Sequence, residues 1–202
     1  MLSENEVEQL ISIPEVNEIV RQVYQEMAKE ESAIQGIGIH DFFSGMLVSP
    51  SIAMARVDGT TSLIEELTIN KKARRISKGG FFLTQDPVVK LVGIMQNQWD
   101  IWEYRLLDGL SKVVAFVTPE LGENSSSNKR MEEGNSFFLD ILRSSYLLVR
   151  LIETFFLPEG EVITNTRKIS KNEFQKMIDI GAQLKLDNVY TFQSFIKTFE
   201  VK

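Results

Sequence analysis

The stretch PVVKLVGIMQNQWDIWEYRLLDGLSKVVAF, residues 87–116, decides the fold of this chain. Its apolar residues recur at spacings of three, four or seven, so they share one face of a helix. Asp86 followed by Pro87 is a helix-start signal, because the carboxylate caps a free backbone N–H and proline presets the helical dihedral. The pattern predicts one amphipathic helix over 87–116 as the spine of the core, with an apolar face made of Val88, Val92, Met95, Trp99, Trp102, Leu106, Val113 and Phe116.

A second apolar helix is predicted over 136–157, where Pro158 ends a broad apolar face. Capping boxes that begin at Ser3, Ser62 and Ser170 predict three further helix starts, because each serine is followed three residues later by glutamate. We therefore expect a mainly α protein, a single-domain helical bundle of about seven helices. Its two long central helices, 87–116 and 136–157, are expected to pack directly against each other in antiparallel orientation.

Two segments interrupt this helical pattern. Residues 33–61 contain several glycines and a proline, which predicts short irregular pieces wrapped across one side of the bundle. Residues 118–134, TPELGENSSSNKRMEEG, have the composition of a flexible surface loop. The helices on both sides of this loop are too apolar to stand alone, so we expect one domain over residues 1–202.

The composition excludes several classes of protein. Cysteine is absent, which excludes disulfide frameworks, thiolate nucleophiles and cysteine-based metal sites. The first ten residues, MLSENEVEQL, lack the basic start of a signal peptide, so we expect a cytoplasmic protein. No membrane span is expected, because charged residues that are costly at a bilayer centre interrupt the most apolar helix: Asp140, Arg143, Arg150 and Glu153.

The negative charge of the chain is concentrated near its beginning. Residues 1–35 hold eight glutamates against Arg21 and Lys29, which accounts for the whole net charge of −6. A nucleic-acid-binding protein needs many cationic contacts to phosphate, so we expect no nucleic-acid partner.

His40 is the only histidine and the only side chain with an unperturbed pKa near neutrality. It is a candidate haem ligand, or a general base oriented by Asp41. The alternative is an ordinary residue at a helix start. One histidine cannot supply a two-histidine metal site, and no G-x-S-x-G serine elbow is present. We therefore assign neither a metal site nor a catalytic residue.

Trp99 and Trp102 are candidate ligand-binding residues. Together with the aromatic stripe Phe192, Phe195 and Phe199, they have the chemistry of an apolar cavity between bundle helices. Core packing is the commoner use of such stripes. Haem or a small apolar molecule is the ligand that this hypothesis implies, and no cofactor follows from the sequence directly.

Complementary charges suggest an interaction surface. Glu15, Glu18, Glu26 and Glu30 lie on an amphipathic helix near the start of the chain, whereas Lys71, Lys72, Arg74 and Arg75 form a basic run. The alternative interpretation of the basic run is a solvent-exposed helix C-terminus, where cations complement the helix dipole.

These observations favour a non-enzymatic interaction or regulatory module that binds a protein partner or itself, as a homo-oligomer. One alternative is a sensor or carrier that binds a small apolar ligand or haem between helices. Another is an enzyme that uses His40 and Asp41, which requires residues from distant segments to converge on His40 in a polar cleft.

Overall fold

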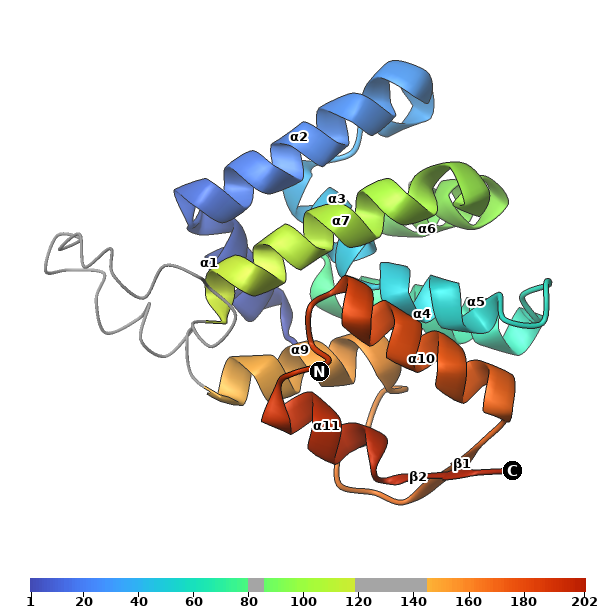
Figure 1. The fold of residues 1–202 in the computed structure, drawn as a ribbon. Coiled ribbons are helices and arrows are strands. Elements are labelled where there is room, and N and C mark those ends of the chain that lie inside the picture. Colours follow the sequence, from blue (N-terminus) through green and yellow to red (C-terminus); the bar gives the residue numbers. More distant parts are fainter. Residues whose placement is uncertain (80–85, 119–144) are drawn as a thin grey trace, which may run out of the picture.

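The computed structural model describes residues 1–79, 86–118 and 145–202. Within them the chain is mainly helical, which confirms the predicted fold class (Figure 1). The helices are α1 (Glu4–Ser12), α2 (Pro14–Glu30), α3 (Ile39–Leu47), α4 (Ser49–Ala55), α5 (Leu63–Ile76), α6 (Pro87–Asn97), α7 (Trp99–Val117), α9 (Ser145–Phe156), α10 (Lys171–Gln183) and α11 (Tyr190–Ile196), with a 3₁₀ turn, η1 (Ser32–Ile34). Two short strands, β1 (Arg167–Ile169) and β2 (Phe199–Val201), pair in parallel.

The predicted helix starts lie where their capping signals place them. Ser3, Ser62 and Ser170 each accept a hydrogen bond from the backbone N–H of the glutamate three residues later, and that glutamate bonds back to the cap. Asp86 caps α6 through the N–H of Val88, and Pro87 is the first helical residue. These local signals work because they satisfy backbone donors that no helical carbonyl can reach.

The predicted single helix over 87–116 is in fact two helices, since the helix breaks at Gln98. The φ and ψ angles of Gln98 are −121° and 29°, outside the helical region, and the chain changes direction there (Figure 1). The Gln98 side chain accepts a hydrogen bond from Trp102 Nε1 and donates one to Glu31 on the loop after α2. The break lets α6 pack on α3 and α5 while α7 packs on α2 and α4.

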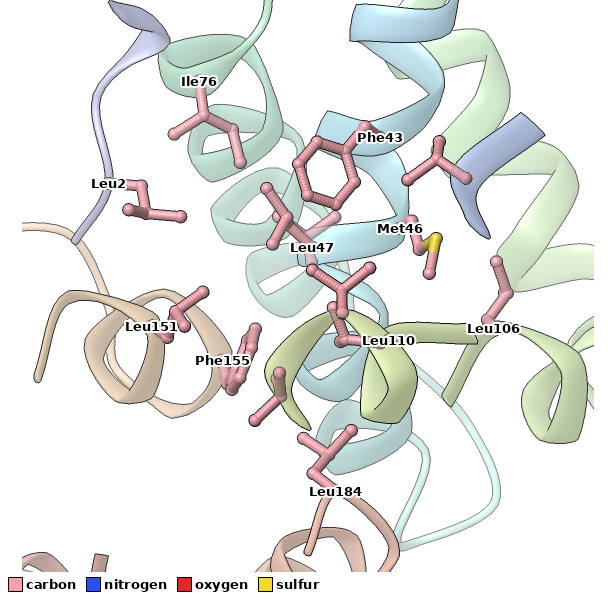
Figure 2. Close-up of a cluster of buried hydrophobic side chains, with 14 of the residues drawn as sticks. Leu2, Phe43, Met46, Leu47, Ile76, Leu106, Leu110, Leu151, Phe155 and Leu184 are labelled. Atoms are coloured by element: carbon pink, nitrogen blue, oxygen red, sulfur yellow. The ribbon is translucent and has the colours of Figure 1, made fainter. Parts of the chain in front are cut away.

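Residues 33–61 are the clearest correction to the sequence prediction. Instead of wrapping across one side, they form η1, α3 and α4, and α3 lies at the centre of the protein. Every residue of α3 from His40 to Leu47 is buried. Figure 2 shows Phe43 and Leu47 of α3 among side chains from the surrounding helices, including Ile76, Leu110 and Phe155. His40, Asp41 and Ser44 of α3 are buried together with its apolar residues, so the polar side of this short helix does not mark a solvent-exposed face.

Two glycines let neighbouring backbones approach α3. A Cβ atom added at Gly45 would lie 2.5 Å from Leu91 Cδ2 of α6. One added at Gly109 of α7 would lie 2.6 Å from Val23 Cγ2 and 2.9 Å from Met46 Cε. Gly45, one of the glycines that predict irregular structure in 33–61, therefore allows close packing within a helix instead.

α9 (Ser145–Phe156) is the described part of the helix predicted over 136–157. Its main helix neighbours are α4 and α11, so it does not pack mainly against the spine as predicted. Arg150 pairs with Glu6 of α1 at 3.0 Å, and the buried Glu153 carboxylate accepts from the amino group of Met1. The charges within this helix thus connect it to the first helix of the chain. Asp140, Arg143 and nearly all of the predicted loop 118–134 lie outside the described residues.

No helix in the described ranges combines the length and the apolar character needed to cross a bilayer.

Substitution of Gly45 by alanine should destabilise the protein. Alanine improves helix propensity by about 1 kcal/mol, but overpacking against the fully buried Leu91 costs about 1–3 kcal/mol. The matched control is Gly93→Ala in α6, where an added Cβ meets nothing within 4 Å and propensity alone should stabilise. Urea unfolding of both variants tests this; equal gains in the free energy of unfolding would contradict the close contact at α3.

Candidate functional site

The exposed face of α5 carries an unusual cluster of apolar side chains. Leu63, Ile64 and Leu67 are 70%, 77% and 60% exposed. The opposite face of α5 is buried through Ile69 and Ala73 among others. Leu63, Ile64 and Leu67 therefore do not belong to the core stripe, and we refer to them as the α5 apolar cluster. Grouped apolar exposure of this kind is typical of an interaction site.

The basic run continues the same face of α5 towards its C-terminus. Lys71 and Arg75 both pair with Glu159, at 2.9 Å for Lys71, and hold the pKa of the Glu159 carboxyl below its usual value. Arg74 pairs with Asp86 at 3.0 Å. All three cations remain largely exposed. The exposed face of α5 is thus apolar in its first half and basic in its second.

Lys72 does not belong to this surface, in contrast to the sequence prediction, because it is only 3% exposed. Its Nζ donates to the carbonyl of Thr154 at 3.0 Å and to Ser51 Oγ at 2.6 Å, while Ser51 Oγ donates to the carbonyl of Phe155 at 2.7 Å. These carbonyls belong to the last turn of α9, which lacks helical partners for them. Lys72 and Ser51 therefore cap the C-terminus of α9, a favourable place for a cation.

Burial lowers the pKa of Lys72 from 10.5 to about 7. In the described ranges Lys72 forms no ion pair, and its hydrogen-bond partners are all neutral. It is thus a buried amine without a counter-ion, an arrangement that proteins rarely keep.

A hollow of about 300 Å³ lies beside Lys72, between α4, α5 and the end of α9. Its lining is mainly apolar and includes Met54, Ala55, Ile64 and Phe156. Ile64 belongs to both the hollow and the α5 apolar cluster, so the hollow opens next to the exposed face of α5.

The acidic residues predicted as an interaction surface lie exposed on α2. Glu30 pairs with Arg105 at 2.6 Å, whereas in the described part of the chain Glu15, Glu18 and Glu26 form no ion pair. α2 and α7 pack directly against each other, and a hollow of about 250 Å³ is lined by residues of both helices. Tyr104, which is 72% exposed, lies at this hollow together with Ile19, Val23, Glu26, Asp108 and Lys112. The lining of this hollow includes the cations Arg105 and Lys112 as well as the carboxylates Glu26 and Asp108, and the exposed Glu15 and Glu18 add negative charge on α2. We refer to the hollow and these glutamates as the α2/α7 surface.

The structure separates the aromatic residues that were candidates for one cavity. Trp102 is buried and donates from Nε1 to Gln98. Trp99 lies at a hollow of about 600 Å³ whose other side chains are mainly polar, including the ion-paired Glu103 and Lys176. The phenylalanines form a separate cluster: Phe156, Phe192 and Phe195 contact one another, and Phe199 meets Phe195 edge to face. None of the hollows described here is lined by residues of both groups.

His40 is buried between Glu8 of α1 and Asp41, each at 3.6 Å from one ring nitrogen. Burial raises the pKa of the Asp41 carboxyl, but contacts with His40 and with the N–H of Lys78 outweigh it and hold that pKa below its usual value. His40 lines none of the three hollows described above. Segments distant in the sequence do converge on His40, but within the described residues its ring is buried and offers no open face to a substrate or to haem.

In the described residues, no three side chains of His, Asp or Glu are grouped so that they could hold a metal ion. No protein-family model matches the chain, nor does any curated protein or solved structure. The candidate site therefore depends on its own geometry. The α5 apolar cluster was detectable in the sequence, because Leu63, Ile64 and Leu67 lie opposite Ile69, Ala73 and Ile76 on a helical wheel. The role of Ser51 carries no local signal, since its partners Lys72 and Phe155 lie 21 and 104 residues away.

Lys72 should make stability depend on pH. Its folded-state pKa is lower than its unfolded value, so between about pH 7 and 10.5 the unfolded chain binds more protons and stability rises with pH. Relative to Lys72→Met, the wild type should gain roughly a few kcal/mol across this window. Lys71→Met, which removes an exposed ammonium from the same helix, is the matched control. Urea unfolding between pH 6 and 10 measures the difference; parallel profiles for wild type and Lys72→Met would show that Lys72 does not titrate in this range.

Proposed function

We propose that the protein is a non-enzymatic interaction module that self-associates, with the exposed face of α5 from one copy binding the α2/α7 surface of the next. The observation that carries this proposal is the α5 apolar cluster, three large apolar side chains left in solvent on one helix face. Burying them against another protein removes apolar area from water, which drives most protein association.

The second copy is favoured as the partner because the chain carries a matching surface. The α2/α7 surface offers a hollow beside Tyr104 whose wall includes Ile19 and Val23, and these apolar side chains can contact a leucine from the next copy. Glu15, Glu18 and Glu26 on α2 supply negative charge without an intramolecular ion pair in the described ranges, opposite in sign to Lys71, Arg74 and Arg75. Both apolar and charged parts of the two surfaces are therefore complementary.

The two surfaces differ, so the contact between copies is heterologous rather than a symmetric twofold contact. Such contacts join copies head to tail and form a ring or an open chain. The average mass in solution should therefore rise with protein concentration beyond that of a dimer, unless a closed ring forms.

Leu67→Glu and Tyr104→Glu should each weaken association at least fivefold, because each places an unpaired carboxylate in the contact, a cost of about 1–3 kcal/mol. Tyr190→Glu is the matched control, since Tyr190 is 79% exposed on α11, away from both surfaces. Sedimentation velocity across a range of concentrations measures the mass. Reversal of Glu15, Glu18, Glu26 and Glu30 to lysine should weaken association as well.

A mixture of the two variants tests the head-to-tail geometry directly. Leu67→Glu keeps its α2/α7 surface and Tyr104→Glu keeps its α5 face, so an equimolar mixture should form heterodimers and stop there. A symmetric α5–α5 contact would instead leave Tyr104→Glu fully associated and the mixture without new dimers. A monomeric wild type at all concentrations would overturn the proposal.

A further inference from the structure

The buried amine of Lys72 has bonding capacity that the fold does not use. An ammonium has three N–H donors, and Ser51 Oγ and the Thr154 carbonyl take two of them. Ser51 directs its own hydrogen to the Phe155 carbonyl, so it accepts from Lys72 and has no donor left for a ligand. In its protonated form Lys72 therefore has a donor available to the hollow that it lines, and its charge has no counter-ion in the described ranges.

The hollow beside Lys72 is otherwise suited to hydrocarbon. Met54, Ala55, Phe156, Leu157 and Pro158 supply most of its wall, and its volume of about 300 Å³ is at the lower end of the range for small-molecule sites. A mainly apolar pocket with one well-placed polar group is the usual design of a site for a small amphipathic molecule.

Two carboxylates also border the hollow, and both are already engaged. Glu65 accepts from the backbone N–H and the hydroxyl of Ser62, and Glu173 accepts from the backbone N–H of Ser170. These capping boxes hold both carboxylates at helix N-termini, where the helix dipole compensates their charge. Neither carboxylate reaches ion-pair distance of Lys72.

We propose that this hollow binds a small amphipathic carboxylate, with its carboxyl group on Lys72 Nζ and its alkyl chain along the apolar wall. The ligand supplies the missing counter-ion, and the desolvated, charge-assisted hydrogen bond is of the strong kind. The apolar wall favours an alkyl or aryl chain over a sugar or phosphate ester. This inference does not rest on self-association, because Leu67→Glu leaves Lys72 and the lining of the hollow unchanged.

Calorimetric titration of the full-length protein with decanoate and with decanol tests the proposal. The two probes share an alkyl chain and differ in charge, so decanoate should bind at least tenfold more tightly at pH 7. Lys72→Met should abolish this preference while leaving decanol binding within about twofold. Because a bound carboxylate favours the charged form of Lys72, decanoate binding should also take up protons, which titrations in buffers of different ionisation enthalpy detect.

Ala55→Leu provides a second variant that leaves Lys72 in place and fills part of the hollow, so it should weaken both probes at least fivefold even if Lys72→Met folds poorly. Equal affinity of the two probes in the wild type would show that the hollow binds apolar groups regardless of the charge of the ligand, and would overturn the proposal. So would decanoate binding that survives both substitutions, or the absence of binding by either probe up to its solubility limit.

Discussion

Burial of α3 on every side is the constraint on which the rest of the structure depends. A helix in that position needs neighbours on all sides, and α1, α2, α5, α6 and α7 supply them. Close approach requires Gly45 on α3 and Gly109 on α7, because a Cβ at either site would collide with a buried side chain. The break at Gln98 also surrounds α3 with neighbours, since it lets both α6 and α7 contact this helix although they follow each other in the chain. Packed side chains thus fill the interior, and the features that suit binding lie on the surface of α5 and beside it.

Local signals in the sequence predicted much of the helical content. The capping boxes at Ser3, Ser62 and Ser170 and the Asp86–Pro87 start depend on residues three or fewer positions apart, so one sequence suffices to find them. The apolar period continues unchanged across Gln98, which is why the pattern could not reveal the break. The position of α3 was equally hidden, because glycine weakens a helix in isolation and reveals its packing role only when Leu91 and Met46 are in place.

Candidate site residues were predicted less well because their roles depend on contacts between distant segments. Lys72 looked like one cation in a basic run, yet its position at the buried edge of α5 places it under the last turn of α9. Lys71, Arg74 and Arg75 remain on the surface as the run suggested. His40 was a candidate because it is the only histidine, but the fold places it between two carboxylates and away from the described hollows. A residue type that is rare in the sequence was therefore a poorer indication of the candidate site than the geometry of the fold.

Hydrogen–deuterium exchange at several protein concentrations tests the central claim, that a rigid interior built on α3 presents two surfaces for association. The account predicts that the amides of residues 39–47 exchange slowest at every concentration, because α3 opens only when the whole protein unfolds. Peptides from 62–71 and 101–112 should gain protection as concentration rises. Fast exchange in 39–47, or no concentration dependence in the other two segments, would contradict it.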